Sequence, residues 1–299
     1  MTPALPAAAR PALNDLYDRF ERRRDVADPV HRVRGYADPA DQEVVGFCAA
    51  ALAFGRVASV LRSVDALLAA MGPSPAGFVR HFNPARDHAG IGGITHRWTR
   101  GVDLVALLWI LRQMIEQRGS LEGFFLDGYR PDAADVAPAL ESFCGRAVTM
   151  NVDKIYGSDP RRGVAYFFPR PSRGSGCKRI NLFLRWMVRR DRLDLGAWRR
   201  VNPAKLIVPL DTHVIRVSQC LRLTRYRSPG WAMAREITAS LRRFDGADPV
   251  KYDFALCHLG MMEACGFNQP HRDARCPLRG FCQPRPRTPR RSRRPSVPR

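Results

Sequence analysis

The chain has 299 residues and 45% of them are hydrophobic, so it is long enough to bury one large core or two smaller ones. Its longest apolar stretch, residues 57–71, is interrupted by Arg62 and Asp65, and this excludes a clean membrane span of about 20 residues. The formal net charge of +21 exceeds what solubility requires, so we expect a polyanionic partner, with nucleic acid as the first candidate rather than a membrane.

The basic charge is spread over the whole chain. Residues 283–299 hold seven arginines and five prolines, so this tail supplies +7 of the +21 and leaves +14 for the rest. Its composition predicts a disordered tail, which either adds salt-dependent affinity for phosphates or has no role. Residues 1–12, rich in Ala and Pro, are expected to be a second disordered tail without a secretory signal. We expect a cytoplasmic, nucleoid-associated monomer.

Apolar periodicity predicts helices along most of the expected domain, residues 13–282. The apolar residues recur every 3 to 4 positions, and no segment has the alternation of a β-strand. We expect helices at 13–24, 44–52, 60–68, 104–115, 133–148, 177–190, 212–223, 231–244 and 249–265. Residues 151–173 have little periodicity and are expected to form a long loop. The sequence therefore predicts a mainly α fold.

One lysine is informative because arginine occupies nearly every basic position. The chain has 49 Lys and Arg residues, and only Lys154, Lys178, Lys205 and Lys251 are lysines. A guanidinium does not lose its proton near neutral pH, whereas an amine can become a nucleophile. Lys178 lies in the first turn of a predicted helix, where the helix dipole and apolar neighbours disfavour an ammonium. We interpret the other three lysines as ordinary basic positions.

Two short segments frame this helix. Gly174-Ser175-Gly176 comes directly before it and can present backbone N–H groups to a phosphate. Asp211 stands at the start of the next predicted helix, where Asp is a favoured N-cap. A capping carboxylate can still point its second oxygen into a cleft. We therefore predict that Asp211 is a cap and, with Lys178, a candidate catalytic pair.

An earlier loop mixes cationic and aromatic groups. His96-Arg97-Trp98 lies in a connector rich in Gly, His and Arg. Such a triplet is able to contact a base and a phosphate. Ordinary loop packing is the alternative interpretation, and we favour it.

The two segments around Lys178 and Asp211 resemble motifs of a known superfamily. Gly174-Ser175-Gly176-Cys177-Lys178 is similar to the Gly-x-Gly-x-Lys hairpin of helix-hairpin-helix DNA glycosylases of the endonuclease III type. Asp211-Thr212-His213, with Arg216 and Val217, resembles their Val-Asp-Thr-His-x-x-Arg-Val segment. The hairpin lacks their usual Leu-Pro-Gly lead-in. The longer spacing between the two segments is more similar to the archaeal 8-oxoguanine glycosylase group.

A closer resemblance extends over most of the chain. It is to an uncharacterised bacterial family with Lys-Arg-x-Asn-Leu-Phe-Leu-Arg-Trp-Met-Val-Arg and Pro-Leu-Asp-Thr-His blocks, which match residues 178–189 and 209–213. That family indicates a fold and no reaction.

The glycosylase resemblance implies a fold and an activity. The fold is a two-lobed, mainly α helix-hairpin-helix DNA glycosylase-like architecture with a central cleft, with lobe A at about 40–190 and lobe B at about 13–39 plus 203–282. The activity is base excision with associated AP lyase, in which Lys178 attacks a flipped nucleotide and Asp211 stabilises developing positive charge. Oxidised purines are the expected lesions. The implied DNA-binding residues are Gly174, Ser175, Gly176, Arg179, Arg185, Arg189, His213 and Arg216.

The resemblance also bears on the C-terminal cysteines. Endonuclease III-like proteins hold a 4Fe-4S cluster in Cys-x6-Cys-x2-Cys-x5-Cys, and Cys276 and Cys282 reproduce the last spacing. Cys265 is the candidate first ligand. The remaining place holds Asp273, so the fourth ligand is Asp273 itself, Cys257 or His271. Zinc and a degenerate site without metal are the alternatives.

A non-catalytic protein with the same scaffold is the rival hypothesis. It would bind nucleic acid with Lys178 as a phosphate contact and Asp211 as a cap alone. RNA stays open as the partner because charge does not distinguish it from DNA.

Overall fold

The computed structural model describes residues 5–23, 27–157, 162–261 and 276–282, and within them the chain is mainly α-helical, as predicted. These described residues contain no β-strand, and the only β contacts among them are isolated bridges. The helices are α1 Arg10–Glu21, α2 Val30–Val33, α3 Pro39–Ala51, α4 Val57–Met71, α5 Pro75–Arg80, α6 Pro84–Gly92, α7 Gly101–Arg118, α8 Leu121–Leu126, α9 Ala137–Val148, α10 Asp153–Tyr156, α11 Lys178–Val188, α12 Thr212–Cys220, α13 Trp231–Arg242 and α14 Asp253–Met261.

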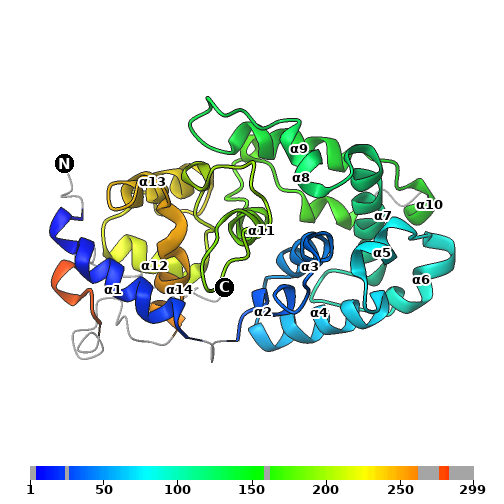
Figure 1. Cartoon of the computed structure of the whole chain (residues 1–299), viewed down its shortest axis with the longest axis horizontal. Helices are drawn as coiled ribbons and strands as arrows, with labels where there is room; N and C mark the ends of the chain where they lie inside the picture. Colours follow the sequence, from blue (N-terminus) through cyan, green and yellow to red (C-terminus); the bar gives the residue numbers. More distant parts are fainter. Residues whose placement is uncertain (1–4, 24–26, 158–161, 262–275, 283–299) are drawn as a thin grey trace, which may run out of the picture.

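The helices gather in two groups with α11 between them (Figure 1). One group holds α1, α12, α13 and α14, and within it α14 packs against both α12 and α1. The other holds α2 to α10, with α6 against α7 and α2 against α3. The segment 13–39, which was expected to belong to lobe B, is therefore divided between the two groups, because α1 joins the first group and α2 joins the second. No helix in the described part of the chain combines the length and apolar character that a membrane span requires.

The expected disorder of residues 1–12 is wrong for the described residues 5–12. Ala7–Ala9 forms a 3-10 helix and α1 starts at Arg10. Leu5 and Ala9 are 2% and 0% exposed, so burial of apolar side chains orders this segment despite its composition. The tail 283–299 lies outside the described residues. The expected loop 151–173 contains α10 and the 3-10 helices Gly163–Phe167 and Pro171–Arg173.

Helix α11 is buried along most of its length. It packs on α3, where the rings of Phe183 and Phe47 meet edge to face with centroids 5.2 Å apart. Gly46 permits this close approach, because a Cβ there would lie 2.9 Å from the terminal methyl of Met187. Trp186 is fully buried on the same helix. The apolar periodicity that predicted this helix therefore corresponds to a buried face.

Charged side chains also fix α11 in place. Arg185 and Arg189 are buried, and Arg185 donates to Asp194 at 3.2 Å and to Asp253 at 2.6 Å. Arg189 donates to Asp248 at 2.9 Å and also pairs with Asp194. These carboxylates come from the segment after α11 and from the α14 region. The network therefore joins the central helix to the first group of helices.

Substitution of Arg185 by Met is expected to destabilise the fold by about 3–5 kcal/mol, because it leaves buried carboxylates without their partner. Arg32→Met is the matched control. Its pair with Asp65 has side chains 41% and 48% exposed, so the expected loss is about 1 kcal/mol or less. Urea unfolding followed by circular dichroism measures both. Equal losses in the two variants would contradict the structural role assigned to the buried network.

Candidate functional site

The turn before α11 holds a strained residue. Gly174 adopts a left-handed conformation with φ of 73° after the 3-10 helix Pro171–Arg173. Cys177 is also left-handed, with φ of 47°, which is uncommon for a residue with a side chain. It is buried, and its thiol donates to the Pro169 carbonyl oxygen at 3.4 Å. This conformation directs the chain from the turn into α11, which begins at Lys178, one residue later than the predicted start at Cys177.

Asp211 is the N-cap of α12, as predicted. Its Oδ1 accepts the backbone N–H of His213 at 2.7 Å, and its own backbone is extended. The thiol of Cys257 on α14 donates to the same oxygen at 3.6 Å. The capping interaction therefore occupies Oδ1 and leaves Oδ2 for another partner.

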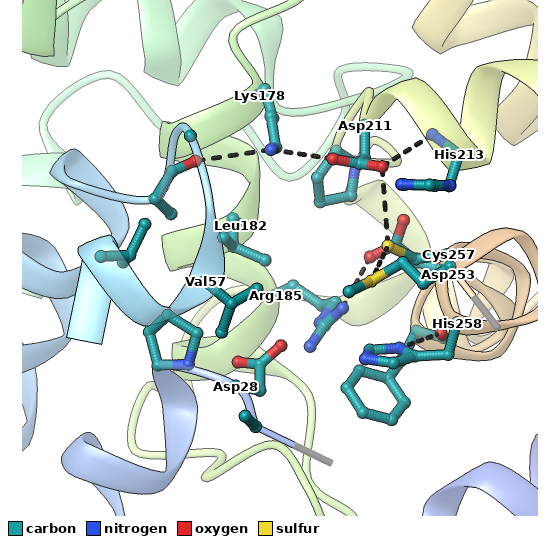
Figure 2. Close-up of a pocket in the computed structure, with 18 residues that line it drawn as sticks. Asp28, Val57, Lys178, Leu182, Arg185, Asp211, His213, Asp253, Cys257 and His258 are labelled. Atoms are coloured by element: carbon teal, nitrogen blue, oxygen red, sulfur yellow. Dashed lines mark hydrogen bonds and ion pairs between the residues drawn. The ribbon is translucent and has the colours of Figure 1, made fainter. Parts of the chain in front are cut away.

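That partner is Lys178. Its Nζ lies 3.1 Å from Asp211 Oδ2 and 3.4 Å from the carbonyl oxygen of Ala53, which follows α3 (Figure 2). The two side chains are 34% and 24% exposed, so solvent reaches both. Three segments distant in sequence thus meet at one amine.

The surroundings of Asp211 keep its carboxylate charged. Burial opposes ionisation, but the positive charge of Lys178, the His213 backbone N–H and the hydrogen bond from Lys178 together lower the pKa of Asp211 below its ordinary value. The carboxylate is therefore ionised at neutral pH.

Lys178 and Asp211 lie on the wall of a cavity of about 170 Å³. Most of the lining is apolar and includes Val57, Val60 and Leu182. Figure 2 shows the polar side chains that converge on it from several elements. These polar residues are Asp28, Arg185, His213, Asp253, Cys257 and His258. An apolar pocket with a few convergent polar groups is typical of a small-ligand site.

Three side chains at this cavity, those of Arg185, His213 and Asp253, have a buried polar atom without a hydrogen-bond partner among the described residues. Oδ1 of Asp253 and Nη2 of Arg185 are buried and have no hydrogen-bond partner there. Burial raises the pKa of Asp253 to about 6, although Arg185 favours its charged form. Buried polar atoms are normally hydrogen-bonded, so this acceptor and this donor are available to the polar groups of a ligand that enters the cavity.

A second, more open groove of about 730 Å³ meets the same lysine. Its lining includes Tyr166, Arg170, Arg173, the turn 174–176 and Lys178. Lys178 therefore lies at the junction of a basic groove and an apolar cavity. No sequence pattern indicated this junction, because it combines residues that lie between positions 27 and 261 of the chain.

The expected DNA-binding arginines of α11 occupy different environments. Arg179 is 8% exposed; it lines the groove, donates to the Ala51 carbonyl oxygen at 3.2 Å and covers the Tyr166 ring at 3.7 Å. Burial lowers the pKa of Arg179 to about 10, which leaves it charged at neutral pH. Arg185 and Arg189 are 2% and 3% exposed in the ion pairs of the fold. Their assignment as phosphate contacts is therefore corrected, because their charges are already neutralised inside the protein.

The other expected DNA contacts lie around the site. Gly174 is exposed, and Ser175 and Gly176 are partly exposed beside the groove. His213 is half-buried at the cavity, and its buried Nδ1 has no hydrogen-bond partner among the described residues. Arg216 is exposed on α12, one turn beyond His213.

The candidate metal ligands are only partly described. Cys265, His271 and Asp273 lie outside the described residues. Cys276 is buried and Cys282 half-buried, on either side of the 3-10 helix Arg279–Phe281. No group of three or more candidate ligands occurs in the described ranges. A 4Fe-4S cluster or zinc stays a prediction, and iron, sulfide and zinc analysis of anaerobically purified protein tests it.

A known protein family matches the part of the chain that contains this site. The family described as "Protein of unknown function (DUF2400)" matches residues 28–262, which include Lys178, Asp211 and Asp253. No curated protein matches the chain. No solved structure matches it either.

Two substitutions separate the roles of Asp211. Asn is as good an N-cap as Asp, so Asp211→Asn is expected to lose only the partly exposed ion pair, about 1 kcal/mol or less. Asp211→Ala also loses the cap, about 1 kcal/mol more. Denaturant unfolding measures both.

The stability difference between wild type and Asp211→Asn also depends on pH. Because the folded-state pKa of Asp211 is lowered, its charged form stabilises the fold above the ordinary pKa, and this contribution is lost as pH falls through the folded value. The two unfolding free energies are therefore expected to differ near neutral pH, and the difference is expected to shrink as pH falls below the ordinary pKa of an aspartate. A difference that stays constant over this range would contradict the assigned ion pair.

Proposed function

The chain belongs to the DUF2400 family, and we propose that it is a DNA base-excision glycosylase with associated AP-lyase activity. One observation carries the proposal. The amine of Lys178 is 3.1 Å from a charged carboxylate and stands where a basic groove meets an apolar cavity. The groove takes the sugar-phosphate strand and the cavity takes a base turned out of the helix.

The dimensions and charge of the two spaces support this division. A cavity of about 170 Å³ is similar to one of about 150 Å³ that binds benzene, so it has room for a planar ring. Arg170 and Arg173 line the groove, and the turn 174–176 lies between them and Lys178. Cationic side chains and backbone N–H groups are the usual partners of phosphate oxygens. The net charge of +21 favours the same polyanion.

The chemistry follows from Lys178 and Asp211. The Lys178 ammonium first gives a proton to Asp211 Oδ2, and the neutral amine then bonds to C1′ of the flipped nucleotide as the bond from C1′ to the base breaks. The electron pair leaves with the base, which takes up the proton held by Asp211. Asp211 Oδ2 then accepts the proton that the bonded amine loses and stabilises positive charge on the sugar. The sugar ring opens to a Schiff base. Loss of a proton from C2′ then breaks the C3′–O bond, with the phosphate as leaving group.

Oxidised purines are the proposed lesions. The spacing between Lys178 and Asp211 resembles that of the archaeal 8-oxoguanine glycosylase group, as noted from the sequence. The unpartnered donor of Arg185 and acceptor of Asp253 suit the edge of a base, which carries both kinds of group.

We also propose the two-lobed helix-hairpin-helix architecture for this fold. Two groups of helices on either side of α11 support it (Figure 1). The hairpin is preceded by the 3-10 helix Pro171–Arg173, in accord with the missing Leu-Pro-Gly lead-in.

A non-catalytic nucleic-acid-binding protein is the second candidate. The observation in its favour is that Asp211 caps α12 and pairs with Lys178, which are both structural roles. In that protein Lys178→Arg keeps full function, because an arginine also binds phosphate and carboxylate. Competition binding with DNA and RNA at a fixed salt concentration identifies the preferred polyanion for either candidate.

Borohydride trapping on duplexes that contain an abasic or 8-oxoguanine site tests the catalytic proposal. We expect wild type to form a covalent adduct and both Lys178→Gln and Lys178→Arg to form none, because neither side chain supplies an amine. Asp211→Asn, which keeps the cap, is expected to slow adduct formation at least about tenfold.

Lys154→Gln is the matched control, because this lysine is exposed on α10, away from α11 in Figure 1. It is expected to trap as well as wild type. The proposed function is wrong if wild type gives no adduct, or if Lys178→Gln traps as well as wild type does.

A further inference from the structure

A turn at residues 96–99 lies beside the site and is held in place by hydrogen bonds. The imidazole of His96 is 2% exposed, and its Nδ1 lies 2.9 Å from Ser63 Oγ on α4. Its Nε2 donates to the carbonyl oxygen of Phe54 at 2.9 Å, and a backbone bridge joins His96 to Thr99. The turn is thus fixed both to α4 and to the segment that follows α3.

These contacts hold the side chains of Arg97 and Trp98 at the surface, and the backbone at Arg97 is strained. Arg97 is left-handed with φ of 55°, a conformation that side chains other than glycine rarely adopt. Trp98, the next residue, is 56% exposed. Gly55 makes room for the turn, because a Cβ there would lie 3.1 Å from Cδ of Arg97. A strained, internally fixed turn that exposes a tryptophan indicates a role outside the core.

Trp98 is part of an aromatic platform, which we define as Phe54, Trp98 and Tyr166. The rings of Phe54 and Trp98 are stacked with centroids 4.8 Å apart, and Tyr166, 42% exposed, meets Trp98 edge-on at 5.5 Å. The guanidinium of Arg97 lies 5.1 Å from the Trp98 ring, and that of Arg179 lies 3.7 Å from Tyr166. The platform therefore combines exposed aromatic rings with positive charge.

The platform borders the proposed active site. Phe54 directly follows Ala53, whose carbonyl oxygen accepts from Lys178 Nζ at 3.4 Å. Tyr166 lines the same groove as Lys178. A strand that lies in this groove therefore passes the platform next to the reacting nucleotide.

We propose that the aromatic platform stacks on an unpaired base of this DNA strand, beside the flipped nucleotide. Every base has a π-face, so stacking on Trp98 and Tyr166 tolerates any sequence, while Arg97 meets the adjoining phosphate. A polyanion that carries planar rings matches both features of the platform. The inference rests on the proposed function in taking DNA as the partner, and it adds a preference for strands with exposed bases.

Two fluorescein-labelled oligonucleotides of equal length test the platform with the full chain. One carries thymine at every position, and the other carries tetrahydrofuran spacers, so the phosphates are the same and only the first has bases to stack. Fluorescence anisotropy at one fixed salt concentration measures both affinities. We expect wild type to bind the thymine strand at least about fivefold more tightly than the spacer strand.

The variants assign that difference to the platform. Trp98→Ala is expected to bind the two strands equally, with spacer affinity unchanged, and Trp98→Phe to restore the preference. Tyr166→Ala is a second truncation with the same expected direction. Tyr226→Ala is the matched control, because this ring is 36% exposed under Arg225 but is not part of the aromatic platform. Circular dichroism establishes that each variant is folded.

The outcomes separate the platform from the proposed function. If wild type prefers thymine and a folded Trp98→Ala keeps that preference, or if Tyr226→Ala loses it equally, the platform assignment is wrong. If wild type binds both strands equally while borohydride adducts still form, the platform alone fails. If wild type binds neither strand and forms no adduct, the proposed function fails and the platform with it.

Discussion

The placement of α11 is the constraint on which the rest of the structure depends. Its N-terminus supplies Lys178, and its last turn holds Arg185 between Asp194 and Asp253 in the interior. Buried ion pairs contribute little net stability, because desolvation offsets their attraction, but the loss of one partner is costly. The network therefore acts mainly to fix position. It holds the lysine at a set distance from α12 and α14, which supply the other residues of the site.

Asp211 shows how one side chain can serve both fold and chemistry. Oδ1 accepts the backbone N–H of His213 in the first turn of α12, and Oδ2 faces Lys178. The cap fixes the rotamer of the carboxylate, so its second oxygen is held in place without further contacts. Cys257 adds a third contact to this group from α14.

The sequence predicted local features well because they depend on neighbours along the chain. Periodicity indicated the helices and placed Lys178 in the first turn of α11, and residue preferences indicated that Asp211 caps α12. The role of Arg185 in the buried ion pairs was missed for two reasons. Its carboxylate partners lie far away in the sequence, at 194 and 253, and arginine side chains are usually exposed to solvent. Trp98 was expected to be ordinary loop packing. Its exposure, and the way its turn is held, depend on contacts with α4 and Phe54 that no sequence pattern contains.

Peptide mass spectrometry of a borohydride-reduced complex with an abasic duplex tests the central claim most directly, because it locates the covalent bond. The account predicts a reduced deoxyribose remnant on the peptide that contains Lys178, with the other lysines and the N-terminal amine unmodified. A remnant on Lys154, Lys205, Lys251 or the N-terminus instead of Lys178, or no modified peptide, would contradict the account.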